Sequence, residues 1–127
     1  MSVLTVRHST DASPERLWRA FTTPELAEWF WPQRFETDVS IDPRVGGGYT
    51  VSSVPMGMAV SGTFTVVDEP SALGFTWRWD GEDAETTVTV AIEDGAVIVT
   101  HSGFETDEAR DDHIQGWNDC LERLPTQ

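Results

Sequence analysis

The residues best suited to chemistry lie near the end of the chain, in the stretch HSGFETDEARDDHIQGW from His101 to Trp117. Several carboxylates separate His101 from His113. An imidazole changes charge near neutral pH, so an interior histidine can move a proton or hold the polar group of a ligand. The stretch could therefore be an acid–base site, a metal site, or only a strand that runs into a helix.

The spacing of the histidines does not favour a metal site. His101 and His113 lie twelve positions apart, with no second pair of ligands at a zinc-binding spacing. Asp107 and Glu108 fall in the first turn of a predicted helix, where the helix dipole stabilises negative charge. We therefore expect neither a metal nor another cofactor.

Both histidines are predicted to reach the interior. His101 is in step with Val97 and Val99, on the covered face of a strand, and His113 shares a helical face with Trp117. Two interpretations stay open for each ring. It contacts the polar group of a ligand, or it makes a hydrogen bond that only stabilises the fold.

Arg110 lies one helical turn before His113, on the same predicted face. Its guanidinium could hold a carboxylate or phosphate at the mouth of a cavity. The alternative is an ion pair with Asp107 or Glu105.

Aromatic side chains are the strongest feature of the sequence, with six Trp and six Phe. Rigid rings on inward positions form a wall for an aromatic or polycyclic ligand, although such sets also serve as plain core packing. The predicted ligand contacts are Trp18, Trp29, Phe64, Trp77, Val99, His101, Arg110, His113 and Trp117. No catalytic residue is predicted.

The elements that must position these residues follow from periodicity and capping. Ser13-Pro14 and Thr23-Pro24 each start a short helix. From Phe35 the pattern alternates with period two, as in half-buried strands. The expected order is a strand at 3–8, the two short helices, strands at 35–42, 49–53, 60–67, 73–79, 88–92 and 97–101, and a long helix at about 106–124. This is an α+β arrangement.

Composition bounds the function. A chain of 127 residues fits one domain, here 1–127, and its net charge of −14, with no Lys, disfavours nucleic acid and anionic membranes. No apolar run approaches the roughly 20 residues needed to span a bilayer, and the N-terminus lacks a secretory signal. The single cysteine suits a reducing cytoplasm.

Six stretches together resemble a known family. They are SPERLWRAF from Ser13, WFWP from Trp29, DPRVGG from Asp42, LGFTW from Leu73, THSGF from Thr100 and HIQGW from His113. They are similar to the START-like (SRPBCC) superfamily, in the branch named after the activator of heat-shock-protein-90 ATPase. The resemblance implies a helix-grip fold, in which a curved antiparallel sheet of about seven strands wraps around a long C-terminal helix. It also implies a cavity between them, and no universal catalytic residue.

The favoured hypothesis is binding of a small hydrophobic ligand (aromatic, acyl or polyketide-like) in that cavity, without catalysis. One alternative is a cyclase or hydrolase that uses the cavity histidines, and another is a chaperone-related interaction module. A homodimer is compatible with free sheet edges, but no residue specifies it.

Overall fold

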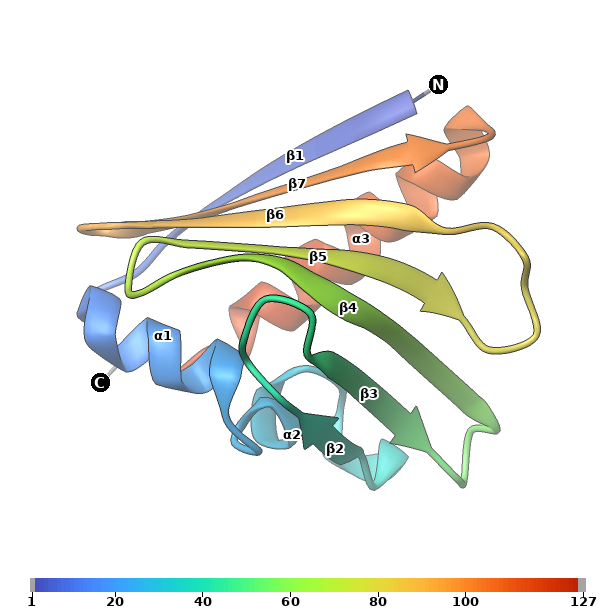
Figure 1. Ribbon diagram of the computed structural model, residues 1–127, viewed down its shortest axis with the longest axis horizontal. Helices are drawn as coiled ribbons and strands as arrows, with labels where there is room; N and C mark the ends of the chain where they lie inside the picture. The colour runs from blue at the N-terminus through green and yellow to red at the C-terminus, as the bar shows by residue number, and fades with distance from the viewer. Residues whose placement is uncertain (1, 126–127) are drawn as a thin grey trace.

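Seven antiparallel strands form one sheet, in the order β1-β7-β6-β5-β4-β3-β2, in the computed structural model, which describes residues 2–125 (Figure 1). The strands are β1 (Ser2–Ser9), β2 (Asp38–Ile41), β3 (Gly48–Ser53), β4 (Met58–Asp68), β5 (Ala72–Trp79), β6 (Thr86–Glu93) and β7 (Ala96–Phe104). The helices are α1 (Pro14–Thr22), α2 (Leu26–Trp29), the 3₁₀ turn η1 (Gln33–Phe35) and α3 (Asp107–Glu122). The long α3 crosses one face of the curved sheet, which confirms the predicted α+β helix-grip fold.

Alternation of side chains along the strands creates the covered face. In β6, Val88, Val90 and Ile92 are buried, whereas the alternating Thr87, Thr89 and Glu93 are exposed. The same period holds in β1 and β7, so the apolar sides of neighbouring strands meet under the helices. Burial of this face supplies the main driving force for folding.

The capping residues place the helices where the sequence predicts them. Ser13 Oγ accepts a hydrogen bond from the Arg16 amide at 3.2 Å, and Pro14 is the first residue of α1. Thr106 Oγ1 accepts from the Ala109 amide at 3.1 Å and starts α3 in the same way. Each cap satisfies an amide that the first helical turn would otherwise leave unpaired.

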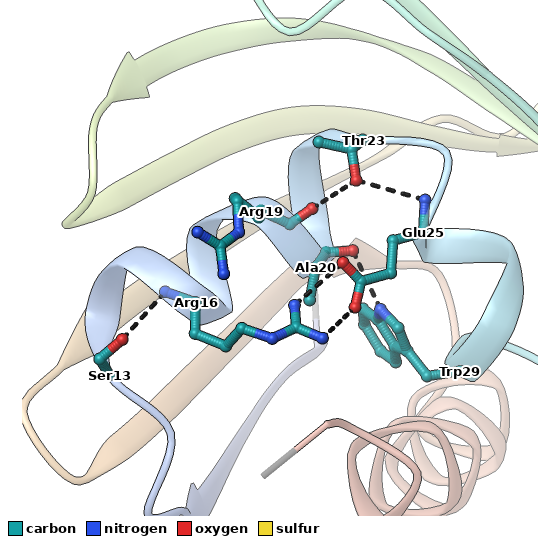
Figure 2. Close-up of polar contacts among 7 residues, drawn as sticks. All are labelled: Ser13, Arg16, Arg19, Ala20, Thr23, Glu25 and Trp29. Carbon is teal, nitrogen blue, oxygen red and sulfur yellow. Dashed lines mark hydrogen bonds and ion pairs between the residues drawn. The ribbon is translucent and has the colours of Figure 1, made fainter. Parts of the chain in front are cut away.

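Polar contacts fix the short helix α2 against α1 (Figure 2). Thr23 Oγ1 donates to the Arg19 carbonyl at 2.7 Å and accepts from the Glu25 amide at 3.2 Å. The Arg16 guanidinium forms a bidentate ion pair with Glu25, with Nη1 2.9 Å from Oε2. The connection between the helices is therefore held on both sides of its turn.

A second set of contacts joins α2 to α1 and to the end of α3. The Trp29 indole donates to the Ala20 carbonyl at 2.9 Å, as Figure 2 shows. Arg123 donates from Nε to the Trp29 carbonyl and from Nη2 to the Phe30 carbonyl, each at 2.9 Å, and pairs with Asp119 at 2.8 Å. A cation at the carboxyl end of a helix satisfies free carbonyls and complements the dipole. The one guanidinium thus anchors α2.

One predicted boundary is wrong. The sequence alternation starts a strand at Phe35, but β2 covers only Asp38–Ile41, and Phe35 ends the turn η1. Glu36 follows in the left-handed region at φ 49°, which interrupts any extended run. The Phe35 carbonyl accepts from Ser53 Oγ at 2.5 Å, so the turn is tied to β3 instead of pairing as a strand.

Candidate functional site

His101 is completely buried, at 0% exposure, and both of its ring nitrogens have partners. Nδ1 accepts from the Trp117 indole at 3.1 Å, and Nε2 lies 2.6 Å from Thr86 Oγ1. The Thr86 hydroxyl donates its single hydrogen to the Trp77 carbonyl at 3.3 Å. His101 Nε2 must therefore carry the proton and donate to Thr86, which makes His101 a neutral imidazole.

The environment of His101 opposes protonation. Burial lowers the pKa of His101 to about 3, and the neighbouring His113 adds to that effect. A proton on Nδ1 would also replace the acceptor of the Trp117 N–H by a second donor. His101 is therefore not available as an acid or base near neutral pH.

His113 is protonated on Nδ1, the opposite tautomer to His101, and it also accepts a hydrogen bond from a tryptophan. Its Nδ1 donates to the Ala109 carbonyl at 2.7 Å, and its Nε2 accepts from the Trp79 indole at 3.0 Å. The rings of His101 and His113 are 5.2 Å apart, and Phe104 packs against both. Each histidine thus serves as the acceptor for one tryptophan, which is the stabilising interpretation of the two.

An apolar cavity of about 30 Å³ lies between the helices and the sheet. It is lined by Phe21, Leu26, Phe30, Ile41, Tyr49, Val51, Phe64, Phe75, Trp77 and Trp117. Three of the predicted ligand contacts, Phe64, Trp77 and Trp117, are among these residues. The cavity is far smaller than the ~300–1,000 Å³ that small-molecule sites offer.

The other predicted walls lie elsewhere in the core. Trp18, Trp29 and Val99 are buried but do not line the cavity. The Trp29 ring packs at 4.9 Å against Phe21, whose own ring reaches the cavity wall. Trp29 therefore supports a wall residue and has no contact with the cavity itself.

Phe30 and Tyr49 line the cavity but were not among the predicted contacts. The Phe30 ring lies 6.0 Å from Trp77 and 5.9 Å from Trp117, between α2, the sheet and α3. The Tyr49 hydroxyl donates to the Thr76 carbonyl at 2.6 Å, and burial raises its pKa. Tyr49 could be recognised by its strand phase, but a helix as short as α2 has too few turns to show which side is buried.

Trp77 occupies the centre of the site. It is 5% exposed, and its indole N–H has no hydrogen-bond partner among the described residues. Its ring borders the apolar cavity and also a gap of about 50 Å³ that reaches Trp31 and Cys120. An unpaired buried donor costs about 1–3 kcal/mol, so this N–H is the free polar group that an acceptor atom of a ligand would satisfy.

A third space, of about 140 Å³, lies where β7 passes into α3. Its walls are Trp77, Trp79, Glu82, Ala84, Thr86, Gly103, Phe104, Glu105, Thr106, Ala109 and His113. Arg110 does not line it. Instead, Arg110 pairs with Asp111 at 3.0 Å and with Asp107 at 3.6 Å, as the ion-pair interpretation predicts.

Other groups that could do chemistry are inactive in this arrangement. Burial raises the pKa of the Cys120 thiol to about 12, so no thiolate forms near neutral pH. Within residues 2–125, no group of three or more His, Cys, Asp or Glu side chains is placed to hold a metal ion. In the same part of the chain, no helix has the length and apolar character needed to cross a membrane.

Comparison with known proteins agrees with the fold. Residues 11–126 match the family described as activator of Hsp90 ATPase homolog 1-like protein. The Mesorhizobium loti protein MLL2253 has a similar structure, with 25% identity and a TM-score of 0.81 over 97% of this chain and 93% of that chain. No curated protein sequence matches the chain significantly.

Two further structures share the fold at lower identity. DynU16, a protein of the dynemicin biosynthetic locus, aligns at 22% identity with a TM-score of 0.83, over 98% of this chain and 46% of DynU16. PFC0360w, an HSP90 activator from Plasmodium falciparum, aligns at 20% identity with a TM-score of 0.75, over 96% of this chain and 92% of that chain.

Proposed function

Because the chain belongs to the family of activator of Hsp90 ATPase homolog 1-like proteins, we propose that it binds a small hydrophobic ligand between the sheet and α3. The observation that carries the proposal is the wholly apolar cavity, whose walls come from α1, α2 with its C-cap, α3 and the strands β2 to β5. The fold shared with DynU16, from a biosynthetic locus, favours an aromatic, acyl or polyketide-like ligand. The domain would act in the cytoplasm.

Entry of such a ligand requires the cavity to enlarge. Phe30 is the wall residue to consider first, because its ring lines both the cavity and the gap beside Trp77, and rotation of the side chain leaves the anchored backbone of α2 in place. Outward movement of Phe30 would join the cavity to the gap beside Trp77. The unpaired Trp77 N–H would then donate to a carbonyl or hydroxyl oxygen of the ligand.

The first test is native mass spectrometry of the protein purified under mild conditions. A bound adduct of a few hundred daltons would identify the ligand class. The second test uses 2-naphthol as a probe, followed by quenching of tryptophan fluorescence. Phe30→Ala should enlarge the cavity and strengthen binding, whereas the matched control Phe35→Ala, at a ring outside the cavity, should not.

A variant that fills the cavity gives the opposite result. Val51→Phe adds volume at a buried wall residue and should abolish 2-naphthol binding. Circular dichroism confirms that the variant is folded. Unchanged 2-naphthol binding by a folded Val51→Phe protein would locate the binding elsewhere and refute the proposal.

A chaperone-related role is the second candidate. The family description and the fold shared with an HSP90 activator favour it. Val54 and Met56, exposed at 83% and 50% on the β3–β4 connection, offer apolar side chains to a partner. Addition of the protein to purified Hsp90 should then raise its ATPase rate, and Val54→Ser should reduce that effect; an unaltered rate would exclude this role.

The histidines do not support a cyclase or hydrolase mechanism. Neither His101 nor His113 has a ring nitrogen free to take a proton from a ligand. We therefore propose binding without acid–base catalysis by these residues.

A further inference from the structure

The pocket of about 140 Å³ at the start of α3 has aromatic walls on several sides. The rings of Trp77 and Trp79 stand 5.5 Å apart at 88°, so their faces point in different directions. The rings of Phe104 and His113, 4.8 Å apart, form another part of the wall. Rings arranged around a small space in this way are typical of cages that hold ammonium groups, because each ring face is electron-rich.

The charges at the pocket have one sign. Glu82 and Glu105 line it with exposed carboxylates, and no Arg lines it among the described residues. Arg110, next to the lining residue Ala109, is held by Asp107 and Asp111. Arg78, between Trp77 and Trp79, lines a different pocket. The net charge of −14 adds a long-range attraction for cations.

Most polar side-chain groups in the wall that are not carboxylates are already used; the exception is the Trp77 N–H, which has no partner among the described residues. Thr86 Oγ1 bonds to His101 and to the Trp77 carbonyl, and both ring nitrogens of His113 are occupied. Thr106 Oγ1 accepts the Ala109 amide. A neutral or anionic ligand would therefore find few free partners here, whereas a cation needs only ring faces and carboxylates.

We propose that this pocket binds an organic cation, namely an ammonium head group on a small apolar body. The volume of about 140 Å³ encloses a head group but not a complete drug-sized molecule. The pocket shares only Trp77 with the apolar cavity, and it does not depend on the proposed hydrophobic ligand. Of the two interpretations of Arg110, this proposal disfavours the one in which the guanidinium holds an anion, since the pocket beside it is lined by Glu82 and Glu105.

The test compares choline with 3,3-dimethylbutan-1-ol, its neutral counterpart of nearly the same shape. Binding is followed by NMR through the indole N–H signals of Trp77 and Trp79. Choline should shift both signals saturably, and the alcohol should bind at least about fivefold more weakly. Equal binding of the two probes, or no shift with choline at millimolar concentration, would overturn the proposal.

Paired variants separate the pocket from the overall charge. Glu82→Gln with Glu105→Gln should weaken choline binding about fivefold to tenfold. The matched control, Glu93→Gln with Glu122→Gln, removes the same charge at exposed positions outside the pocket. It should leave the affinity for choline nearly unchanged. Equal losses in the two double variants would mean that net charge alone attracts choline. Binding of 2-naphthol in the apolar cavity should be the same in both, so failure here is distinguishable from failure of the proposed function.

Discussion

Burial of His101 in its neutral form should make the stability of the protein depend on pH. The pKa of His101 is lowered from 6.5 to about 3 in the folded state. Between these values the unfolded chain binds a proton that the folded chain does not. The stabilising contribution is therefore fully present above the unfolded pKa and is lost progressively as the pH falls toward 3.

The size of the effect follows from the two pKa values. At about pH 5 the unfolded histidine is almost fully protonated and the folded one is not, which removes about 2 kcal/mol of unfolding free energy relative to neutral pH. A small domain has only about 5–15 kcal/mol in total, so the loss is readily measured. Among the histidines, His101 should contribute most to this pH dependence of stability, because its ring is completely buried in the fold and becomes exposed on unfolding.

The assay is urea unfolding followed by tryptophan fluorescence, at neutral pH and at about pH 5, for the wild type, His101→Gln and the control His8→Gln. Carboxylate titration is common to all three proteins and cancels in the comparison. The wild type and His8→Gln should lose about 2 kcal/mol more than His101→Gln on acidification. The same loss in all three proteins would refute the reasoning. If His101→Gln does not fold, the ring resonances of His101 in the wild type decide the matter, since they should not shift over this pH range.

Three further predictions concern groups with defined partners. In urea unfolding, Trp117→Phe should lower the free energy of unfolding by about 1–3 kcal/mol more than Trp77→Phe does. The first change leaves the His101 acceptor unpaired, whereas the second removes a donor that has no partner among the described residues. Equal losses would contradict the hydrogen-bond assignment. Arg123→Ala should lower the free energy of unfolding by about 1–2 kcal/mol and speed hydrogen exchange in α2. Arg123→Lys should not restore the protection from exchange, because an ammonium group lacks the planar fork of a guanidinium. Slow exchange in both variants would show that other contacts anchor α2. Thr106→Ala should lower the melting temperature by removal of about 1 kcal/mol of N-cap stabilisation, with Thr106→Ser close to wild type; an unchanged melting temperature for Thr106→Ala would argue against the cap.

Periodicity and capping were sufficient to predict most of the fold. The alternation of β6 and β7 identified the covered face, and the helical spacing identified Trp117, Cys120 and Leu121 as the buried side of α3. These signals are local, because each depends on the geometry of a single element. Phe35 was misplaced because a turn and a strand can carry the same short alternation.

The site was harder to predict because it depends on contacts between elements. Thr86 lies on β6 and His101 on β7, and no spacing in the sequence indicates that their side chains would meet. The phase of α2 placed Phe30 rather than Trp29 at the cavity. The ion pair of Arg110 with Asp107 was foreseeable, since the two residues lie three positions apart on one helix.

The position of β1 in the sheet sets the order in which the chain can fold. β1 is an edge strand paired with β7, with Leu4 opposite His101, and α3 packs against both strands. The partner strand β7 is therefore synthesised only after β2 to β6, and Leu4 and Val6 stay uncovered until then. Closure of so long a loop raises the contact order and slows folding to the millisecond-to-second range typical of non-local sheets. During that interval the unpaired strand is the segment of the nascent chain most exposed to aggregation.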